Sequence, residues 1–410
     1  MKCRHCGTAL EHVFADLATS PPSNAYLTAE QLLLPEKYYP LRVFVCHGCW
    51  LVQTEDYATA DELFAADYAY FSSFSESWLA HSRAYVNTMV ERFGIGASSM
   101  VIEVAANDGY LLQYVKAAGI PCLGVEPTAS TAKAARGRGI EIVERFFGEE
   151  LATELVAGGL RADLMVANNV LAHVPDINDF VRGFTELLRD SGVATFEFPH
   201  LASLIREVQF DTIYHEHFSY LSFTAIKGIF ERNGLQVFDV EKLPVHGGSL
   251  RVYVQQKAGG RRPASGAVAR LLHHEDELGL CRLETYKGFQ ARAEKIKNDL
   301  LRFLLTARAE GKRVAAYGAA AKGNTLLNFA GIRGDLVNYV VDRNPAKQGK
   351  FMPGSRIPIV AEEVLKADVP DYVLILPWNL GEEIVTQLAY VTERGGRFVR
   401  AVPALTVTGG

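Results

Sequence analysis

The chain has 410 residues, of which 49% are hydrophobic and 22% charged, and its net charge is −5. This balance is typical of a soluble globular protein of two to four domains, and without a single-sign tail it gives no support to nucleic acid or an anionic membrane as a partner. No apolar run reaches the roughly 18–20 residues that a membrane span needs. The polar, cysteine-bearing N-terminus does not resemble a signal peptide, so we expect a cytoplasmic protein.

Six cysteines are present, and four of them form two CxxC pairs near the N-terminus. Disulfides explain such pairs poorly in a reducing compartment, whereas four thiolates form a closed, tetrahedral structural site for Zn²⁺. The stretch between the pairs is longer than in a usual zinc ribbon, so the chain must make an excursion between the two knuckles. Redox-active or unpaired thiols are the alternative. The predicted zinc ligands are Cys3, Cys6, Cys46 and Cys49.

Three domains are predicted. A zinc-binding domain over residues 1–65 is followed by a helix over 77–93, where apolar residues recur at helical spacing. Short apolar strands then alternate with helices, which predicts a parallel, doubly wound, Rossmann-like sheet over residues 66–262. A charged helical connection over 263–310 leads into a second alternating unit, so residues 263–410 are predicted to form a second Rossmann-like domain. The predicted fold class is α/β.

Small, acidic and amide residues follow successive strands of the central domain. The turn Ala105-Ala106-Asn107-Asp108-Gly109 lets the backbone approach a ligand, but it lacks the glycines of a dinucleotide-binding turn, which disfavours NAD. Glu126 can accept hydrogen bonds from ribose hydroxyls, the aromatic pair after the third strand can hold adenine, and the asparagine pair after the fourth can face a methionyl group. Together they predict S-adenosylmethionine, with a nucleotide-binding domain without methyl transfer as the alternative. The predicted cofactor-binding residues are Glu103, Ala105, Asn107, Asp108, Gly109, Leu111, Glu126, Phe146, Phe147, Asn168 and Asn169.

The segment Tyr214-His215-Glu216-His217 has the densest concentration of titratable groups in the chain. A catalytic metal is disfavoured, because the zincin pattern needs HExxH on a helix and these histidines are too close together. A proton-transfer cluster is favoured, since the pKa values of His and Glu can both be tuned towards neutrality. A purely structural network is the alternative. His173 follows the fourth strand and should face the same cavity, and further polar candidates are Tyr68, His200 and His246.

Taken together, these motifs resemble the sugar C-methyltransferases of antibiotic deoxysugar biosynthesis, most of all those acting on carbon 3 of a dTDP-3-amino-4-keto-deoxysugar. The resemblance runs essentially end to end and rests on the paired CxxC motifs and on segments 70–75, 107–112, 125–127, 168–174, 214–220, 246–251 and 317–325. The cofactor turn lacks the glycine that many relatives carry before it. The resemblance implies a zinc domain, a methyltransferase domain and a C-terminal domain, with the sugar nucleotide between the last two. It also implies that the reacting sugar is surrounded by Tyr68, His173, Tyr214, Glu216 and His217.

Carbon methylation next to a ketone requires a base and donors for the developing enolate oxygen. We expect His217 to be the base and Glu216 to orient or polarise it, with Tyr214 and His173 as donors and Tyr68 positioning the sugar. In the C-terminal domain a lysine at a helix N-terminus can neutralise pyrophosphate or can be an exposed surface lysine, and a tryptophan can stack on thymine or simply pack. The expected substrate-binding residues are Tyr70, Ser73, His200, His246, Lys322, Asn324, Arg343 and Trp378.

Two other functions fit the same residues. N- or O-methylation of a nucleotide sugar needs a weaker base, because the nucleophile carries its own lone pair. A non-catalytic zinc protein that senses S-adenosylmethionine needs no base, which the histidine cluster argues against. The expected partner is a dTDP-linked ketosugar rather than nucleic acid or a membrane, and we expect a monomer. The substituent at carbon 3 and the stereochemical course stay open.

Overall fold

The computed structural model describes residues 1–57 and 71–409. The N-terminal sheet consists, in spatial order, of β1 (His12–Ser20), β2 (Tyr39–Val45), β3 (Val52–Thr54) and β9 (Ser219–Tyr220). The last strand comes from far downstream and pairs antiparallel with β3. The N-terminal module is therefore completed by the residues that follow the predicted catalytic segment.

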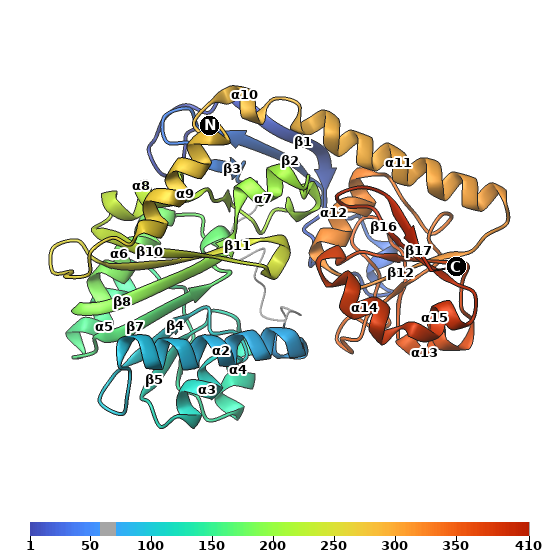
Figure 1. Cartoon of the computed structure of the whole chain (residues 1–410). Helices are drawn as coiled ribbons and strands as arrows, with labels where there is room; N and C mark the ends of the chain where they lie inside the picture. The colour runs from blue at the N-terminus through green and yellow to red at the C-terminus, as the bar shows by residue number, and fades with distance from the viewer. Residues whose placement is uncertain (58–70, 410) are drawn as a thin grey trace.

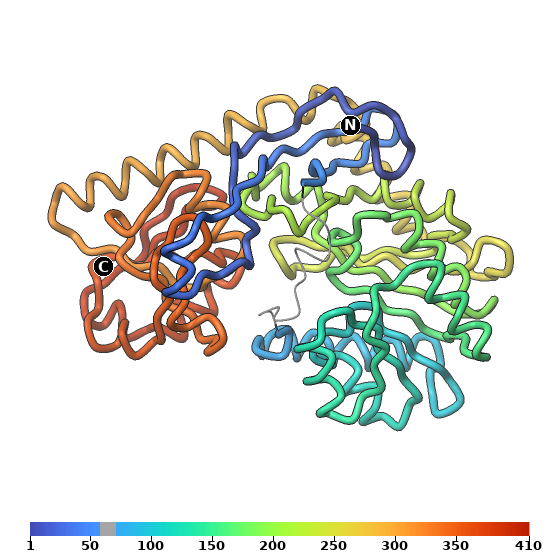
Figure 2. Tube along the Cα trace, turned by 180° about the vertical axis from the view of Figure 1, so that it is seen from behind, coloured from blue at the N-terminus to red at the C-terminus, as the bar shows by residue number. Residues whose placement is uncertain are grey.

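The chain between the two CxxC pairs makes the expected excursion, and part of it crosses to the C-terminal domain (Figure 2). Residues 21–38, here called the strap, leave the sheet after β1 and return at β2. Leu27 and Phe351 exchange main-chain hydrogen bonds of 3.0 and 2.8 Å. Farther along, the Glu36 carboxylate accepts a bond of 2.6 Å from the Gly354 amide and pairs with Arg356 at 3.4 Å. The strap thereby joins the first and last domains.

The central sheet has the spatial order β6-β5-β4-β7-β8-β11-β10. Its first five strands are parallel and the last two antiparallel, which confirms the predicted doubly wound sheet. The strands are β4 (Val101–Val104), β5 (Cys122–Val125), β6 (Ile142–Val143), β7 (Ala162–Asn168), β8 (Leu188–Pro199), β10 (Leu235–Leu243) and β11 (Ser249–Gln256). The helices are α2 (Glu76–Phe93), α3 (Leu112–Ala117), α4 (Ala129–Gly137), α5 (Glu149–Ala157), α6 (Ile177–Leu187), α7 (Leu201–Arg206) and α8 (Phe223–Arg232).

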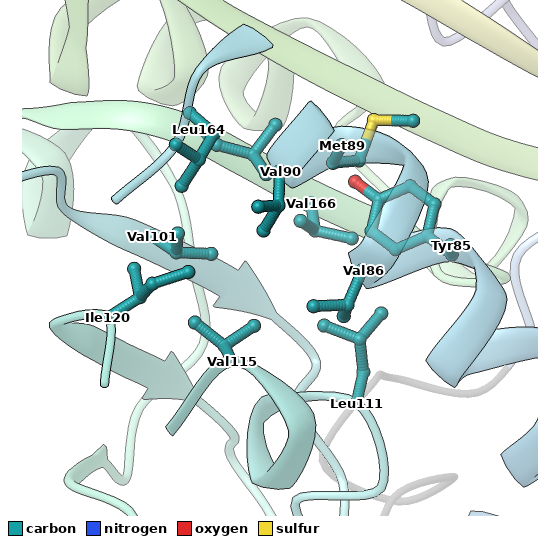
Figure 3. Close-up of a pocket in the computed structure, with 11 residues that line it drawn as sticks. Tyr85, Val86, Met89, Val90, Val101, Leu111, Val115, Ile120, Leu164 and Val166 are labelled. Atoms are coloured by element: carbon teal, nitrogen blue, oxygen red, sulfur yellow. The ribbon is translucent and has the colours of Figure 1, made fainter. Parts of the chain in front are cut away.

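Helix α2 confirms the helix predicted over 77–93. The Ser75 side chain caps its N-terminus, and Gly94 ends it in the left-handed conformation with φ 65°. Its buried face packs against β4, α3 and β7, and Figure 3 shows Val86 and Met89 among the apolar side chains that meet there. The space left between them is about 10 Å³. This face of the sheet is packed core, so a ligand must bind elsewhere.

The connection after β11 contains three helices rather than the single helical stretch expected: α9 (Gly266–Glu277), α10 (Leu283–Tyr286) and α11 (Phe289–Ala309). Gly279 and Gly288, with φ of 72° and 80°, adopt a conformation that stops a helix. Helix α11 runs from beside the N-terminal strands to the C-terminal domain (Figure 1). At its start the Gln290 side chain bonds to both main-chain groups of Asp16 in β1.

The C-terminal domain confirms the predicted second Rossmann-like unit. Its sheet has the order β14-β13-β12-β15-β16-β17, and every neighbouring pair is parallel except the last. The strands are β12 (Val314–Tyr317), β13 (Val340–Val341), β14 (Ile359–Val360), β15 (Tyr372–Ile375), β16 (Arg397–Arg400) and β17 (Thr406–Thr408). The helices are α12 (Ala321–Phe329), α13 (Glu362–Ala367), α14 (Gly381–Gln387) and α15 (Ala389–Glu393). Among residues 1–57 and 71–409, no helix has both the length and the apolar character required to cross a bilayer.

Candidate active site

A cavity of about 590 Å³ lies where the three domains meet. It opens at the carboxyl ends of β4, β5 and β7, where a doubly wound sheet binds its ligands. The central domain supplies most of its wall, the strap contributes Asn24, and the C-terminal domain contributes residues at the ends of β12, β13 and β15. The polar lining residues discussed below are Asn24, Asn107, Glu126, Asn168, Asn169, His173, Tyr214, His217, His246, Lys322 and Lys347.

The turn after β4 is tight and carries three left-handed residues: Ala105 (φ 59°), Asn107 (φ 49°) and Gly109 (φ 79°). The Asn107 amide donates to the Glu126 carboxylate at 2.9 Å, which ties the turn to the end of β5. A Cβ at Gly109 would lie 2.4 Å from Ile140 Cδ1, and the φ of 79° disfavours any residue with a side chain, so the turn is strained by a substitution there. The turn and Glu126 thus present main chain and a carboxylate side by side in the cavity.

Four predicted residues stand behind this turn rather than in the cavity. The Asp108 carboxylate contacts the Ser73 hydroxyl and forms an ion pair of 3.3 Å with Arg138. Ser73 therefore braces the cofactor turn, contrary to the expectation that it contacts the sugar. Glu103 and Leu111 are fully buried, and burial raises the pKa of the Glu103 carboxyl well above its usual value. The two predicted residues Tyr68 and Tyr70 lie outside the described residues.

Aromatic and amide side chains line the part of the cavity next to this turn. Phe146 and Phe147 both border it, and the Phe147 ring packs edge-on against Phe184 at 5.2 Å between ring centroids. Asn168 and Asn169 lie at the end of β7. Both side-chain polar atoms of Asn168, and the Asn169 carbonyl oxygen, are buried without a hydrogen-bond partner among the described residues. Buried amides without a protein partner leave polar atoms that a polar ligand can satisfy.

Two imidazoles meet in the other half of the cavity. His217 Nδ1 lies 2.8 Å from the Thr212 carbonyl oxygen and must donate to it, so Nε2 carries the lone pair. His173 Nδ1 donates in the same way to the Glu216 carbonyl at 2.7 Å, and the two rings lie 4.6 Å apart. Burial lowers the pKa of His173 to about 4, and burial together with His173 holds the pKa of His217 well below its usual value. Both rings are therefore neutral at neutral pH.

Tyr214 contacts His217, whereas the Glu216 side chain does not. The Tyr214 ring stacks on His217 at 4.0 Å, and its hydroxyl lies 2.9 Å from His217 Nε2. The Glu216 carboxylate points away from His217 and accepts bonds of 3.2 Å from the amide and side chain of Asn24. The expected orientation of His217 by Glu216 is thus corrected, because the Thr212 carbonyl occupies the imidazole Nδ1. Burial raises the pKa of the Glu216 carboxyl.

Of the two other candidate histidines, His246 lines the cavity and His200 does not. His200 is buried and its Nε2 lies 2.7 Å from the Glu275 carboxylate, which also accepts bonds from the Phe223 and Thr224 amides. His200 therefore joins α7 to α9 outside the cavity, contrary to its expected substrate role. His246 does line the cavity, with its ring edge-on to Trp78 at 5.0 Å, and burial lowers its pKa to about 4.

The C-terminal domain brings Lys322 to the cavity at the start of α12. Its ammonium donates to Asn379 at 2.6 Å, lies 4.7 Å from the centre of the Trp378 ring, and has its pKa lowered by burial. The Trp378 indole N–H donates to the Asp211 carboxylate at 2.7 Å. That bond joins the C-terminal and central domains, and Trp378 does not border the cavity, so thymine stacking is not supported.

Two expected sugar-nucleotide residues lie elsewhere, and Lys347 and Asn24 are among the cavity residues that were not predicted from the sequence. Asn324 is fully buried inside α12, and Arg343 is exposed outside the cavity. Lys347 instead lines the wall and donates to the Ala319 carbonyl at 2.8 Å. Its place soon after a strand of the second unit was the signal available for it. Asn24 belongs to the strap, and nothing in its sequence context indicated a site.

The four N-terminal cysteines gather apart from this cavity. Their Sγ atoms lie within 4.8 Å of one another, with 3.5 Å between Cys3 and Cys49 and between Cys6 and Cys46. Four thiolates at the usual Zn–S distance of about 2.3 Å stand about 3.8 Å apart at the corners of a tetrahedron. The cluster fits the predicted zinc site after a small adjustment of the sulfur atoms.

Comparison with known proteins gives a match to each of the three domains. Residues 3–64 match the model of a zinc binding domain, 78–240 that of a methyltransferase domain, and 244–403 that of the C-methyltransferase C-terminal domain. The chain is 36% identical over 404 residues to the C-methyltransferase NovU of Streptomyces niveus, covering 98% of this chain and 95% of that protein.

Two solved structures that resemble this chain each cover less than half of it. Magnesium protoporphyrin IX methyltransferase of Synechocystis PCC 6803, with bound S-adenosylmethionine, is 13% identical with a TM-score of 0.34, over 44% of this chain and 79% of that one. The PH0226 protein of Pyrococcus horikoshii OT3 is 12% identical with a TM-score of 0.37, over 46% of this chain and 95% of that one.

Proposed function

Because this chain belongs to the family of S-adenosylmethionine-dependent C-methyltransferases that carry a zinc-binding domain and a C-terminal C-methyltransferase domain, we propose that it methylates carbon 3 of a dTDP-linked 3-amino-4-keto-deoxysugar. The observation that carries this proposal is the shared cavity. Two neutral imidazoles lie in the same space as the cofactor turn and Glu126. A carbon nucleophile has no lone pair of its own and needs such a base.

In the proposed reaction, His217 Nε2 removes the proton from carbon 3, and the electrons of that C–H bond move to the 4-keto oxygen. The Tyr214 hydroxyl turns from His217 to donate to this oxygen. The expected donation by His173 is corrected, because the one N–H of its neutral ring, on Nδ1, already donates to the Glu216 carbonyl and Nε2 can only accept. Bound S-adenosylmethionine would supply an electrophilic methyl group: the ketone re-forms as carbon 3 bonds to the methyl carbon, the S–CH3 bond breaks, S-adenosylhomocysteine leaves, and the abstracted proton stays on His217. Tyr68 keeps its expected role of positioning the sugar.

The sugar nucleotide is proposed to lie against the C-terminal domain. Lys322 and Lys347 bring two ammonium groups to the wall where β12 ends and α12 begins. A pyrophosphate between them would meet positive charge and the amide groups of the helix N-terminus. The zinc bound by the four cysteines stays outside this chemistry.

The deciding experiment offers a panel of dTDP-4-ketosugars together with S-adenosylmethionine carrying a ¹³C-methyl group. We expect NMR of the product to place the label on carbon 3 of a 3-amino sugar. A label on nitrogen or oxygen would contradict the proposed chemistry and favour the other methyl-transfer reactions.

The proposed base is tested by His217→Asn, which keeps a hydrogen-bonding side chain but removes the basic nitrogen. We expect turnover to fall at least 100-fold, in line with the usual effect of losing a general base. The dissociation constant of S-adenosylmethionine, measured by calorimetry, should stay within about twofold. Near wild-type turnover would assign the base to another group in the cluster.

A further inference from the structure

Strand β3 connects the cysteine cluster to the catalytic segment. Gln53 is fully buried, and its side-chain amide donates to Cys3 Sγ at 3.2 Å while its carbonyl oxygen accepts from the Arg4 amide at 2.9 Å. Both contacts lie within the first metal knuckle. The main chain of Gln53 pairs with Ser219 of β9, two residues after His217. The metal knuckle and the catalytic segment are therefore bound to the same residue.

The next residue of β3 holds His217 itself. The buried Thr54 hydroxyl donates to the His217 carbonyl at 3.1 Å, and the Thr54 amide donates to the Phe218 carbonyl at 3.2 Å. On the other side, the Phe218 amide donates to the Ala172 carbonyl at 2.8 Å, next to His173. The main chain of residues 217–218 is thus clamped between the zinc module and the loop that carries the second imidazole.

The Arg4 side chain reinforces this clamp from the metal knuckle. Its guanidinium donates to the Thr54 carbonyl at 3.0 Å and to the Pro175 carbonyl at 2.8 Å, and it lies 5.3 Å from the centre of the Phe218 ring. Arg4 stands between the first two cysteines in sequence. If bound metal holds the first knuckle in place, it also holds the Arg4 guanidinium against Thr54 on one side of the loop and Pro175 on the other.

We propose that Thr54 is a positioning residue for His217, and that Gln53 and Thr54 couple order at the Cys₄ centre to the placement of the imidazole. This inference rests on the proposed role of His217 as the base. The ring is anchored at Nδ1 by Thr212 and at its main chain by Thr54, so Nε2 has a fixed place only when both anchors hold. Loosening the second anchor displaces the base without touching the cofactor turn.

The test compares Thr54→Val, which keeps the shape but removes the hydroxyl, with Thr54→Ser, which keeps the hydroxyl. We expect Thr54→Val to lower kcat about tenfold, since a displacement of about 1 Å can cost up to 100-fold, and to leave KM for S-adenosylmethionine within about twofold. Thr54→Ser should recover most of the loss. Thr88→Val is the matched control, because the Thr88 hydroxyl makes a similar 2.9 Å bond to the Ala84 carbonyl on the exposed side of α2.

Hydrogen–deuterium exchange supplies a readout independent of turnover. We expect Thr54→Val and Gln53→Leu, each with zinc still bound, to speed exchange in a peptide covering residues 214–221 and to leave β4 and β7 unchanged. His217→Asn should lose turnover with exchange as in the wild type. If His217→Asn kept its turnover while Thr54→Val still loosened the loop, the proposed base would be wrong but the clamp would stand. Unchanged exchange and kcat in Thr54→Val, or equal losses in Thr54→Val and Thr54→Ser, would overturn the positioning role.

Discussion

Trp378→Phe tests a contact between the central and C-terminal domains. Asp211 is fully buried, and its Oδ2 accepts the Trp378 indole N–H at 2.7 Å. Burial raises the pKa of Asp211 from 3.8 to about 6, while the charge of Lys322 and the indole bond both pull it down. Phenylalanine keeps an aromatic ring at the interface and removes the donor.

The size of the effect follows from that bond. A hydrogen bond to a charged group contributes roughly 1.5–3 kcal/mol, which corresponds to about one to two pKa units, so the pKa of Asp211 should rise to about 7–8 in Trp378→Phe. A carboxyl with a raised folded pKa stabilises the fold fully below its unfolded pKa of 3.8, and this stabilisation is lost as pH rises through the folded pKa. Because the folded pKa is higher in the variant, the variant loses more of this stabilisation than the wild type does. The difference in the free energy of unfolding that this causes is absent near pH 5 and reaches roughly 1.5–3 kcal/mol near pH 8.

The assay is urea unfolding of both proteins at pH 5 and pH 8, followed by circular dichroism. The loss of ring volume contributes equally at both pH values and cancels in the comparison. Asp211→Asn is the control background, because an amide accepts the indole bond but cannot ionise. Trp378→Phe in that background should have the same effect at both pH values. A pH-independent effect in the wild-type background would refute the linkage between this bond and the carboxyl charge.

Three further outcomes are expected. Gly109→Ala should weaken S-adenosylmethionine binding at least tenfold by calorimetry, because its Cβ would meet Ile140. Gly119 has a similar φ of 70° and open space around it, so Gly119→Ala should bind the cofactor normally. Equal affinities of the two variants would contradict the role of the turn. His173→Asn should be less destabilising at pH 5 than at pH 7.5, by about 2 kcal/mol. The folded pKa of His173 is about 4 against 6.5 in the unfolded chain, so the wild type, but not the variant, loses stability from this group as pH falls below 6.5. An equal effect at both pH values would show that the ring is not buried in its neutral form. Cys46→Ser should lose most of its zinc by mass spectrometry of the metal while Cys281→Ser keeps one equivalent, and full zinc in Cys46→Ser would remove it from the ligand set.

The features predicted from the sequence are those encoded locally. The CxxC pairs indicate a thiolate site because two ligands stand on each knuckle, and the sulfur atoms do gather. The parallel sheets follow from apolar strands that alternate with helices. The cofactor turn, Glu126 and Asn168 were predicted to share one edge because the carboxyl ends of parallel strands lie together.

The features that the sequence did not indicate depend on partners far along the chain. His200 looks like a site residue until Glu275, from a later helix, is seen to pair with it. Glu216 stands beside His217 in sequence, yet its carboxylate faces Asn24 from the strap. The indole N–H of Trp378 donates to Asp211. In each case a local motif predicts the residue's chemistry, whereas the tertiary neighbour decides what the side chain is used for.

The strap has a consequence for building hybrid enzymes. Consider a hybrid in which the C-terminal domain of this chain is replaced by that of a relative. Leu27 and Glu36 of the strap would then face residues of the relative in place of their present partners, Phe351 and Gly354. Under the proposed placement of the sugar nucleotide against the C-terminal domain, specificity is best transferred by exchanging residues 21–38 together with that domain, as two separate inserts. A crossover placed only after the central sheet would divide these two segments between two parents.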